Sequence, residues 1–189
     1  LNAKRPIIKP LQRRVGKLQN LIFKGTATAL VTPFDKAGNI NFKKLEQLIE
    51  FQVQNGADAL LVAGTTGECS TLTEDEKAEM VVFASETIKK RVPLIAGAGT
   101  NCTSDTAREC RRLEAAGADA LLLVTPYYNK CSETGLIEHY KACADATSLP
   151  FILYNVPGRT GVNIRPELYE KLLKVKNVQA VKEASGDVK

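Results

Sequence analysis

The chain has 189 residues, of which 44% are hydrophobic and 25% charged, and its net charge is +5. This composition fits one folded core rather than a disordered protein, and no apolar run approaches the roughly 20 residues that cross a bilayer. Six of the 26 basic residues lie in residues 1–22, which contain no acidic residue. The rest of the chain is nearly neutral, so we expect a cytoplasmic protein with neither a membrane nor a nucleic acid as partner.

Residues 1–22 form a basic arm in front of the predicted folded domain, which covers residues 23–189. Leu11, Val15 and Leu18 are spaced as on one face of a short amphipathic helix. Such an arm suits a docking helix or the remnant of an organelle-targeting segment, and in the second case the protein would belong in an organelle.

From Phe23 onward, short apolar runs alternate with amphipathic stretches of helical period. This alternation is typical of βα units around a parallel sheet. We predict strands at residues 25–31, 58–63, 93–98, 119–125, 151–155 and 178–183.

Helices are expected between the strands, and several have recognisable ends. Residues 42–54 offer an apolar face and are followed by Gly56, which is typical of a helix terminus. Thr73 and Glu76 have the spacing of a capping box. Three later helices are predicted from their caps: Thr103 or Ser104 for one through Leu113, Ser132 for one through Ala144, and Pro166 in the first turn from Arg165 to Leu173.

A repeated sequence supports this count of βα units. Residues 56–62, Gly-Ala-Asp-Ala-Leu-Leu-Val, recur as residues 117–123, Gly-Ala-Asp-Ala-Leu-Leu-Leu. In each copy the glycine ends a helix and the apolar run begins a buried strand. We therefore predict an α/β fold of the (β/α) TIM-barrel type.

The predicted barrel is truncated. An eight-unit barrel usually takes about 250 residues, whereas this chain provides about six of the eight units. A doubly wound sheet is the alternative, but no glycine-rich phosphate-binding sequence follows the first strand. Open edges would expose unpaired backbone, so such a chain should pair with another chain or fold poorly.

Cysteine and histidine do not form a metal-binding pattern. The only histidine is His139, and no two cysteines have C-x-x-C spacing. We therefore predict no metal site, and reduced thiols at Cys69, Cys102, Cys110, Cys131 and Cys143.

The chemistry of a parallel barrel gathers where its strands end. Here the second strand ends in Gly-Thr-Thr-Gly-Glu (64–68), and the fourth in Thr-Pro-Tyr-Tyr-Asn (125–129). The fifth runs into Tyr-Asn-Val-Pro-Gly-Arg-Thr-Gly (154–161), and the sixth contains Lys182 next to Glu183.

Lys182 lies in an apolar strand. If its side chain points into a barrel, it loses hydration and becomes a nucleophilic amine suited to ketones. The alternative is that it faces outward, because only one of the adjacent residues Lys182 and Glu183 can point inward.

The other strand ends offer partners for a small acid. Backbone amides and hydroxyls between Gly64 and Gly67 could hold a carboxylate, although a plain turn explains them as well. The phenol of Tyr154 suits a proton relay, and Arg159 suits bidentate capture of a second carboxylate. A buried structural tyrosine and a solvated loop arginine remain the simpler alternatives.

Taken together, these motifs resemble the dihydrodipicolinate synthase family of Schiff-base pyruvate lyases, over Phe23 to Asp187. The resemblance implies a catalytic domain of the barrel type in which Lys182 forms an imine with pyruvate, without metal or organic cofactor. It also implies roles for the other strand-end residues: Tyr154, Thr65 and Tyr128 in a proton relay, Thr66 on the pyruvate carboxylate within the Gly64–Gly67 loop, and Arg159 on the carboxylate of the second substrate.

The resemblance further implies a reaction and an assembly. The reaction is condensation of pyruvate with aspartate 4-semialdehyde to 4-hydroxy-tetrahydrodipicolinate, in lysine and diaminopimelate biosynthesis. Because Tyr128 matches a residue that enters a neighbouring subunit's site, a homodimer or homotetramer is implied.

Two alternatives stay open. Sister lyases for N-acetylneuraminate or keto-deoxy-sugar acids share the lysine but typically lack the Pro-Gly-Arg-Thr-Gly loop around Arg159. A truncated, inactive relic acting as a binding or assembly protein would fold but form no imine.

Overall fold

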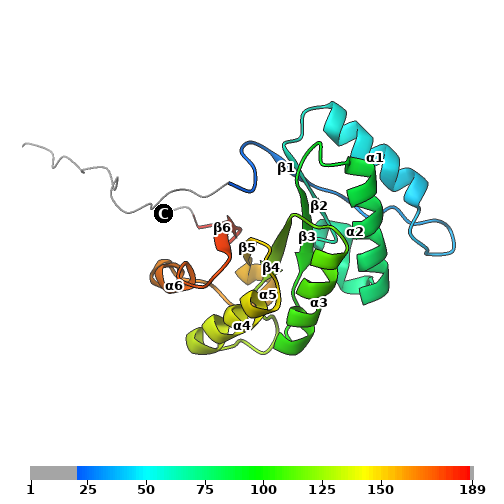
Figure 1. Ribbon diagram of the computed structural model, residues 1–189. Helices are drawn as coiled ribbons and strands as arrows, with labels where there is room; N and C mark the ends of the chain where they lie inside the picture. The colour runs from blue at the N-terminus through cyan, green and yellow to red at the C-terminus, as the bar shows by residue number, and fades with distance from the viewer. Residues whose placement is uncertain (1–20, 188–189) are drawn as a thin grey trace, which may run out of the picture.

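The computed structural model describes residues 21–187, so the helix predicted around Leu11, Val15 and Leu18 lies outside the described residues. Six parallel strands form one sheet, in which each strand pairs with its neighbours in sequence order (Figure 1). The strands are β1 (Ala27–Ala29), β2 (Ala59–Val62), β3 (Leu94–Ala98), β4 (Ala120–Val124), β5 (Phe151–Asn155) and β6 (Val178–Glu183).

Helices join the strands and cover the outer side of the curved sheet (Figure 1). Neighbouring helices pack in chain order, α1 against α2, α2 against α3, α3 against α4, and α4 against α6. Their bounds are α1 (Phe42–Gln54), α2 (Glu74–Ile88), α3 (Thr103–Ala115), α4 (Glu133–Ala146), α5 (Pro157–Thr160) and α6 (Pro166–Leu172), with short 3-10 turns η1 (Thr65–Gly67) and η2 (Cys69–Thr71). Within residues 21–187, no helix is long and apolar enough to cross a membrane.

The strand order confirms the barrel type and excludes the doubly wound alternative. A doubly wound sheet reverses its strand order partway, whereas this sheet runs from β1 to β6 without reversal. Across the described part of the chain, β1 and β6 each have one partner strand, so the sheet is a partial barrel with two open edges.

The sheet has two distinct apolar faces. Leu60, Leu121 and Phe151 point outward and pack with the helices in the larger core. Leu61 and Leu122, one residue along, belong to a second cluster of strand residues on the concave side, here called the inner face. Because side chains alternate along a strand, β2 to β6 each contribute to both clusters.

The predicted caps are confirmed at three helices and wrong at one. Thr73 and Glu76 form the capping box of α2, Ser132 caps α4, and Pro166 opens α6. The N-cap of α3 is Cys102 instead of Thr103 or Ser104. Thr103 is already helical, and its hydroxyl lies 3.0 Å from Nδ1 of His139 on α4 instead of capping its own helix.

The repeated sequence has a repeated structural role. Gly56 and Gly117 both follow a helix with positive φ, +86° and +98°, which favours glycine. The carboxylate of Asp58 accepts the backbone N–H of Thr26 at 2.7 Å, just before β1. Asp119 accepts that of Leu94 at 2.9 Å, at the start of β3. Each copy therefore ties a new strand to the beginning of its predecessor.

Candidate functional site

Lys182 and Tyr154 lie opposite each other on the two last strands. The register of β5 and β6 pairs these residues, and Nζ of Lys182 lies 4.5 Å from the centroid of the Tyr154 ring. Tyr154 belongs to the inner-face cluster, so Lys182 also points to the inner face and Glu183 points outward. The prediction that only one of the two adjacent residues faces inward is confirmed, and it is the lysine.

The amine of Lys182 borders an apolar cavity of about 360 Å³ on the inner face. Its walls come from successive strands and include Ala29, Leu61, Ile95, Leu122 and Ile152. Lys182 itself is exposed, because β6 is an edge strand in the described part of the chain. The arrangement gives one amine in front of an apolar wall, open to small molecules.

A second, smaller cavity of about 30 Å³ lies under the Gly-Thr-Thr-Gly loop. Thr65 and Tyr154 both line it, together with Gly97 and Lys77. The volume suits about one water molecule, which needs polar partners of this kind. The structure thus brings two of the predicted relay residues, Thr65 and Tyr154, to one small cavity.

Hydrogen bonds fix the Gly-Thr-Thr-Gly loop in the 3-10 turn η1. The N–H of Gly67 donates to the carbonyl of Gly64 at 2.9 Å, and the buried hydroxyl of Thr32 donates to the carbonyl of Gly67 at 2.6 Å. Neither glycine has positive φ; Ala63 and Glu68 do instead. The glycines therefore serve close approach rather than conformational freedom.

A buried ion pair supports the loop from behind, and sequence reasoning missed it. Nζ of Lys77 on α2 lies 2.8 Å from Glu109 on α3, and the two side chains are 12% and 5% exposed. The other oxygen of Glu109 accepts the N–H of Gly99 at 2.9 Å. Burial also raises the pKa of the nearby Cys69 thiol, which disfavours a thiolate there. The pair could not be recognised from sequence because its members lie 32 residues apart on different helices.

Gly97 of β3 was also missed. A Cβ built on it would lie 2.1 Å from the carbonyl oxygen of Ala63, well inside contact distance. The chain leading into the Gly-Thr-Thr-Gly loop therefore passes directly over Gly97. A lone glycine within an apolar strand was the available signal.

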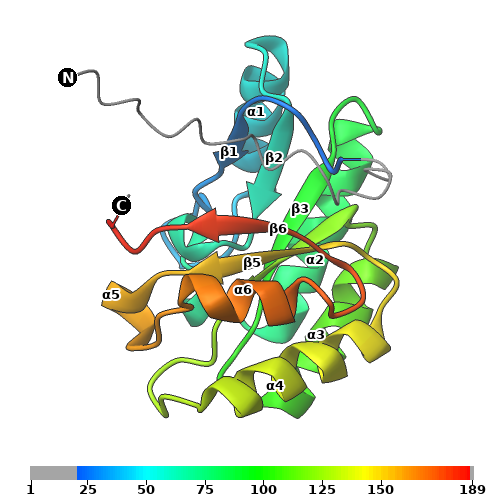
Figure 2. The same ribbon diagram turned by 90° about the vertical axis from the view of Figure 1, so that its left-hand side faces the viewer.

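Thr66, Arg159 and Tyr128 lie exposed at the same rim. Arg159 is on the short helix α5, which follows β5 where the strand ends (Figure 2). Tyr128 is 86% exposed with φ of +72°, and its N–H donates to the carbonyl of Thr160 at 3.3 Å. Within residues 21–187, no hydrogen bond or ion pair links these three side chains to Lys182.

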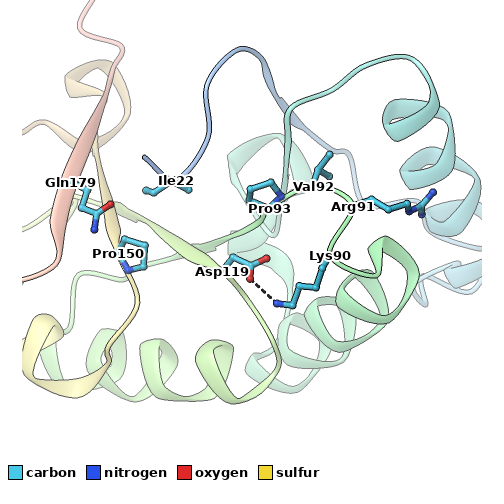
Figure 3. Close-up of a pocket in the computed structure, with 8 residues that line it drawn as sticks. All are labelled: Ile22, Lys90, Arg91, Val92, Pro93, Asp119, Pro150 and Gln179. Carbon is cyan, nitrogen blue, oxygen red and sulfur yellow. Dashed lines mark hydrogen bonds and ion pairs between the residues drawn. The ribbon is translucent and has the colours of Figure 1, made fainter. Parts of the chain in front are cut away.

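A larger cavity of about 500 Å³ lies at the opposite end of the sheet (Figure 3). It is lined where strands begin, by residues such as Pro93, Pro150 and Gln179, and its charges are paired, Lys90 with Asp119 at 2.6 Å. None of the predicted site residues borders it. In the described residues, no group of three His, Cys, Asp or Glu side chains is placed to hold a metal ion.

Comparisons with known proteins agree with the fold and the motifs. The curated 4-hydroxy-tetrahydrodipicolinate synthase of Clostridium novyi is 50% identical over 166 residues, which are 88% of this chain and 56% of that protein. A solved dihydrodipicolinate synthase from Bacillus anthracis superposes with a TM-score of 0.84 at 46% identity, over 87% of this chain and 56% of that one.

The chloride-inhibited dihydrodipicolinate synthase of Acinetobacter baumannii, solved in complex with pyruvate, gives a TM-score of 0.85 at 44% identity, with 87% of this chain and 56% of that one covered. The chain thus spans little more than half the length of these relatives. The family model described as the dihydrodipicolinate synthetase family matches residues 22–189. On this match, and on the strand-end motifs that it contains, the chain belongs to the dihydrodipicolinate synthetase family.

Proposed function

We propose that this chain carries the imine-forming part of a lyase that condenses pyruvate with aspartate 4-semialdehyde. The observation that carries the proposal is the placement of Lys182 on the inner face, 4.5 Å from the ring of Tyr154 and beside an apolar cavity. Family membership and the solved pyruvate complex of the Acinetobacter relative support the choice of pyruvate.

The reaction begins with attack of the neutral Lys182 amine on the keto carbon of pyruvate, with loss of water. The protonated imine withdraws electrons from the adjacent methyl group, so that a methyl proton can leave. The enamine carbon then attacks the aldehyde carbon, and the resulting alkoxide takes a proton. Finally the amino group of the semialdehyde attacks the imine carbon, which closes the ring and releases Lys182. No metal or organic cofactor enters these steps.

Proton transfer is assigned to Tyr154 and Thr65. Both residues line the same small cavity, so one water there can link them without a direct contact. Thr66, at the exposed start of η1, is assigned to the pyruvate carboxylate, because amide groups at the start of such a turn have no partner within it. The close-packed Gly64 and Gly67 hold the turn in place.

Arg159 is assigned to the carboxylate of the semialdehyde. Its guanidinium is exposed at the rim and makes no ion pair within residues 21–187. A cation at this place favours a short acid over a sugar acid, whose hydroxyl groups need hydrogen-bond partners instead. Arg159→Ala should raise KM for the semialdehyde more than for pyruvate, whereas Arg165→Ala, which removes an exposed arginine paired with Glu133, should leave both unchanged. If Arg159→Ala changed the KM for the semialdehyde and the KM for pyruvate by the same factor, the assignment would be wrong.

The proposal includes a homodimer or homotetramer. Tyr128 is 86% exposed although it is a large aromatic residue with positive φ, which fits a side chain that projects toward a neighbouring subunit. The relay through Tyr128 then requires a second copy of the chain. One relative in the comparison is described as a monomeric variant, so assembly is not universal among these proteins.

A condensation assay tests the function as a whole. The protein, incubated with pyruvate and aspartate 4-semialdehyde, should form a cyclic product that absorbs in the ultraviolet after dehydration. Lys182→Ala should abolish product formation, and Lys176→Ala, which removes an exposed lysine just before β6, should not. Unchanged turnover in Lys182→Ala would overturn the proposal.

A further inference from the structure

The pairing of β6 with β5 contains an irregularity that bears directly on Lys182. Phe151 pairs with Val178, but the next residue, Ile152, pairs with Ala180, so Gln179 is an extra residue in β6. Continuing the first register would place Val181 opposite Tyr154. Lys182 would then turn to the outer face, because a slip of one residue reverses every side chain.

A hydrogen-bonded network at the end of the two strands holds the observed register. Asn155, which is 1% exposed, pairs with Glu183, and its Nδ2 donates to both carboxylate oxygens at 3.1 and 3.0 Å. Its Oδ1 accepts the N–H of Ile164 at 3.0 Å, and Nδ2 also donates to Asn163 at 2.8 Å. Both polar atoms of the Asn155 side chain therefore have partners in this arrangement.

Glu183 is held from two further directions. The hydroxyl of Tyr169 on α6 donates to its Oε2 at 2.7 Å, and the N–H of Ser185 donates to its Oε1 at 2.7 Å. Figure 2 shows α6, the helix that contains Tyr169, running beside β5 and β6. Desolvation alone would raise the pKa of Glu183, but the hydrogen bonds, that from Asn155 first, outweigh it and lower the pKa to about 2.

We infer that Asn155, Glu183 and Tyr169 are positioning residues, which fix the register of β6 so that Lys182 faces Tyr154 and the inner-face cavity. In the slipped register Glu183 would turn to the inner face, away from the side chain of Asn155. The network therefore favours the observed register over the slipped one. The apolar residues of β6 give no such preference. The effect on imine formation rests on the proposed function. The role of the network in fixing the register does not depend on that function.

Trapping kinetics test the chemical consequence. With pyruvate and cyanoborohydride, Glu183→Gln should label Lys182 at least about tenfold more slowly than the unchanged protein. The amide replaces one of the two oxygens that accept from Asn155 by an NH₂ donor, and misplacement of the amine slows attack. Tyr169→Phe removes a single hydrogen bond and should slow labelling less. Glu170→Gln, an exposed change on the same helix, should have no effect.

Rescue separates positioning from general stability. Combining Asn155→Asp with Glu183→Gln reverses donor and acceptor but keeps the hydrogen bond between the strands. The double variant should recover most of the labelling rate. If the two changes acted independently, their effects would add, and the double variant would label more slowly than either single variant. Labelling of Glu183→Gln at the unchanged rate, or a double variant slower than both single ones, would overturn the inference.

A direct measurement of strand pairing needs no pyruvate. Cross-strand amide contacts in nuclear magnetic resonance spectra should place Lys182 opposite Tyr154 in the unchanged protein and lose or shift that pairing in Glu183→Gln. An intact Tyr154–Lys182 pairing in the variant would refute the inference even if labelling fails. Failure of the unchanged protein to form an imine, with the pairing changed in the variant, would instead remove the proposed function and leave the positioning role.

Discussion

At the scale of single residues, the charges behind the site matter more than those on the surface. The side chains of Lys77 and Glu109 are only 12% and 5% exposed, so each depends on the other for compensation of its charge. The Lys90–Asp119 pair is even shorter, at 2.6 Å against 2.8 Å, but its side chains are 68% and 31% exposed. Short distance alone therefore does not predict a large contribution to stability.

Replacing Lys77 by methionine should destabilise the protein strongly, because Glu109 remains buried without its counter-charge. We expect a loss of about 3 kcal/mol in the free energy of unfolding, measured by urea denaturation. The matched change Lys90→Met should cost less than about 1 kcal/mol. Equal losses in the two variants would contradict the account of the buried pair.

Glu183 gives a pH dependence with a defined sign. Its pKa is about 2 in the folded protein and ordinarily 4.5. A carboxylate with a lowered pKa stabilises the fold above its unfolded pKa, and that contribution is lost as the pH falls through the folded value. The gap in urea midpoint between the unchanged protein and Glu183→Gln should therefore shrink between about pH 4.5 and about pH 2. If this difference in urea midpoint stayed constant over the range, the charge of the Glu183 carboxylate would not contribute to stability.

At the scale of elements, the chain repeats one connection. A helix ends at a glycine with positive φ, and an aspartate two residues later ties the new strand to the previous one. The repeated sequence predicted this unit. The hydrophobic period and the helix caps predicted most helices and strands, and the predicted bounds of β5 and β6 agree with the structure to the residue. The turns η1 and η2, the helix α5 and the Cys102 cap were not predicted, because each depends on contacts between distant segments such as Thr32 with Gly67.

The loop that follows β2 packs closely on β3 because Gly97 of β3 has no side chain. Gly97→Ala should displace the chain at Ala63, because the added Cβ would lie 2.1 Å from a backbone oxygen that cannot rotate away. We expect a loss of about 1–3 kcal/mol in the free energy of unfolding, together with slower imine formation. Gly158→Ala, whose Cβ meets nothing within 4 Å, is the control and should change stability by less than about 0.5 kcal/mol. Similar behaviour of the two variants would contradict the close approach.

At the scale of the whole molecule, the described part is a six-stranded partial barrel whose concave side carries Lys182 and Tyr154. Its inner-face cluster is well covered, with Ile95 2% and Leu122 5% exposed, whereas Val181 at the β6 edge is 38% exposed. The sequence predicted which strand ends carry polar groups, and hence Lys182, Tyr154 and Thr65. It could not predict the Asn155–Glu183–Tyr169 network, because a register shift and a contact from α6 appear only once the strands are paired.

The central claim is that Lys182 is the amine that captures pyruvate. Reduction of the protein with borohydride in the presence of pyruvate, followed by peptide mass spectrometry, tests it directly. We predict an N-carboxyethyl group on Lys182, absent without pyruvate and absent from Lys182→Arg. Folded protein in which Lys182 stays unmodified, or in which another lysine such as Lys176 carries the group, would contradict the claim.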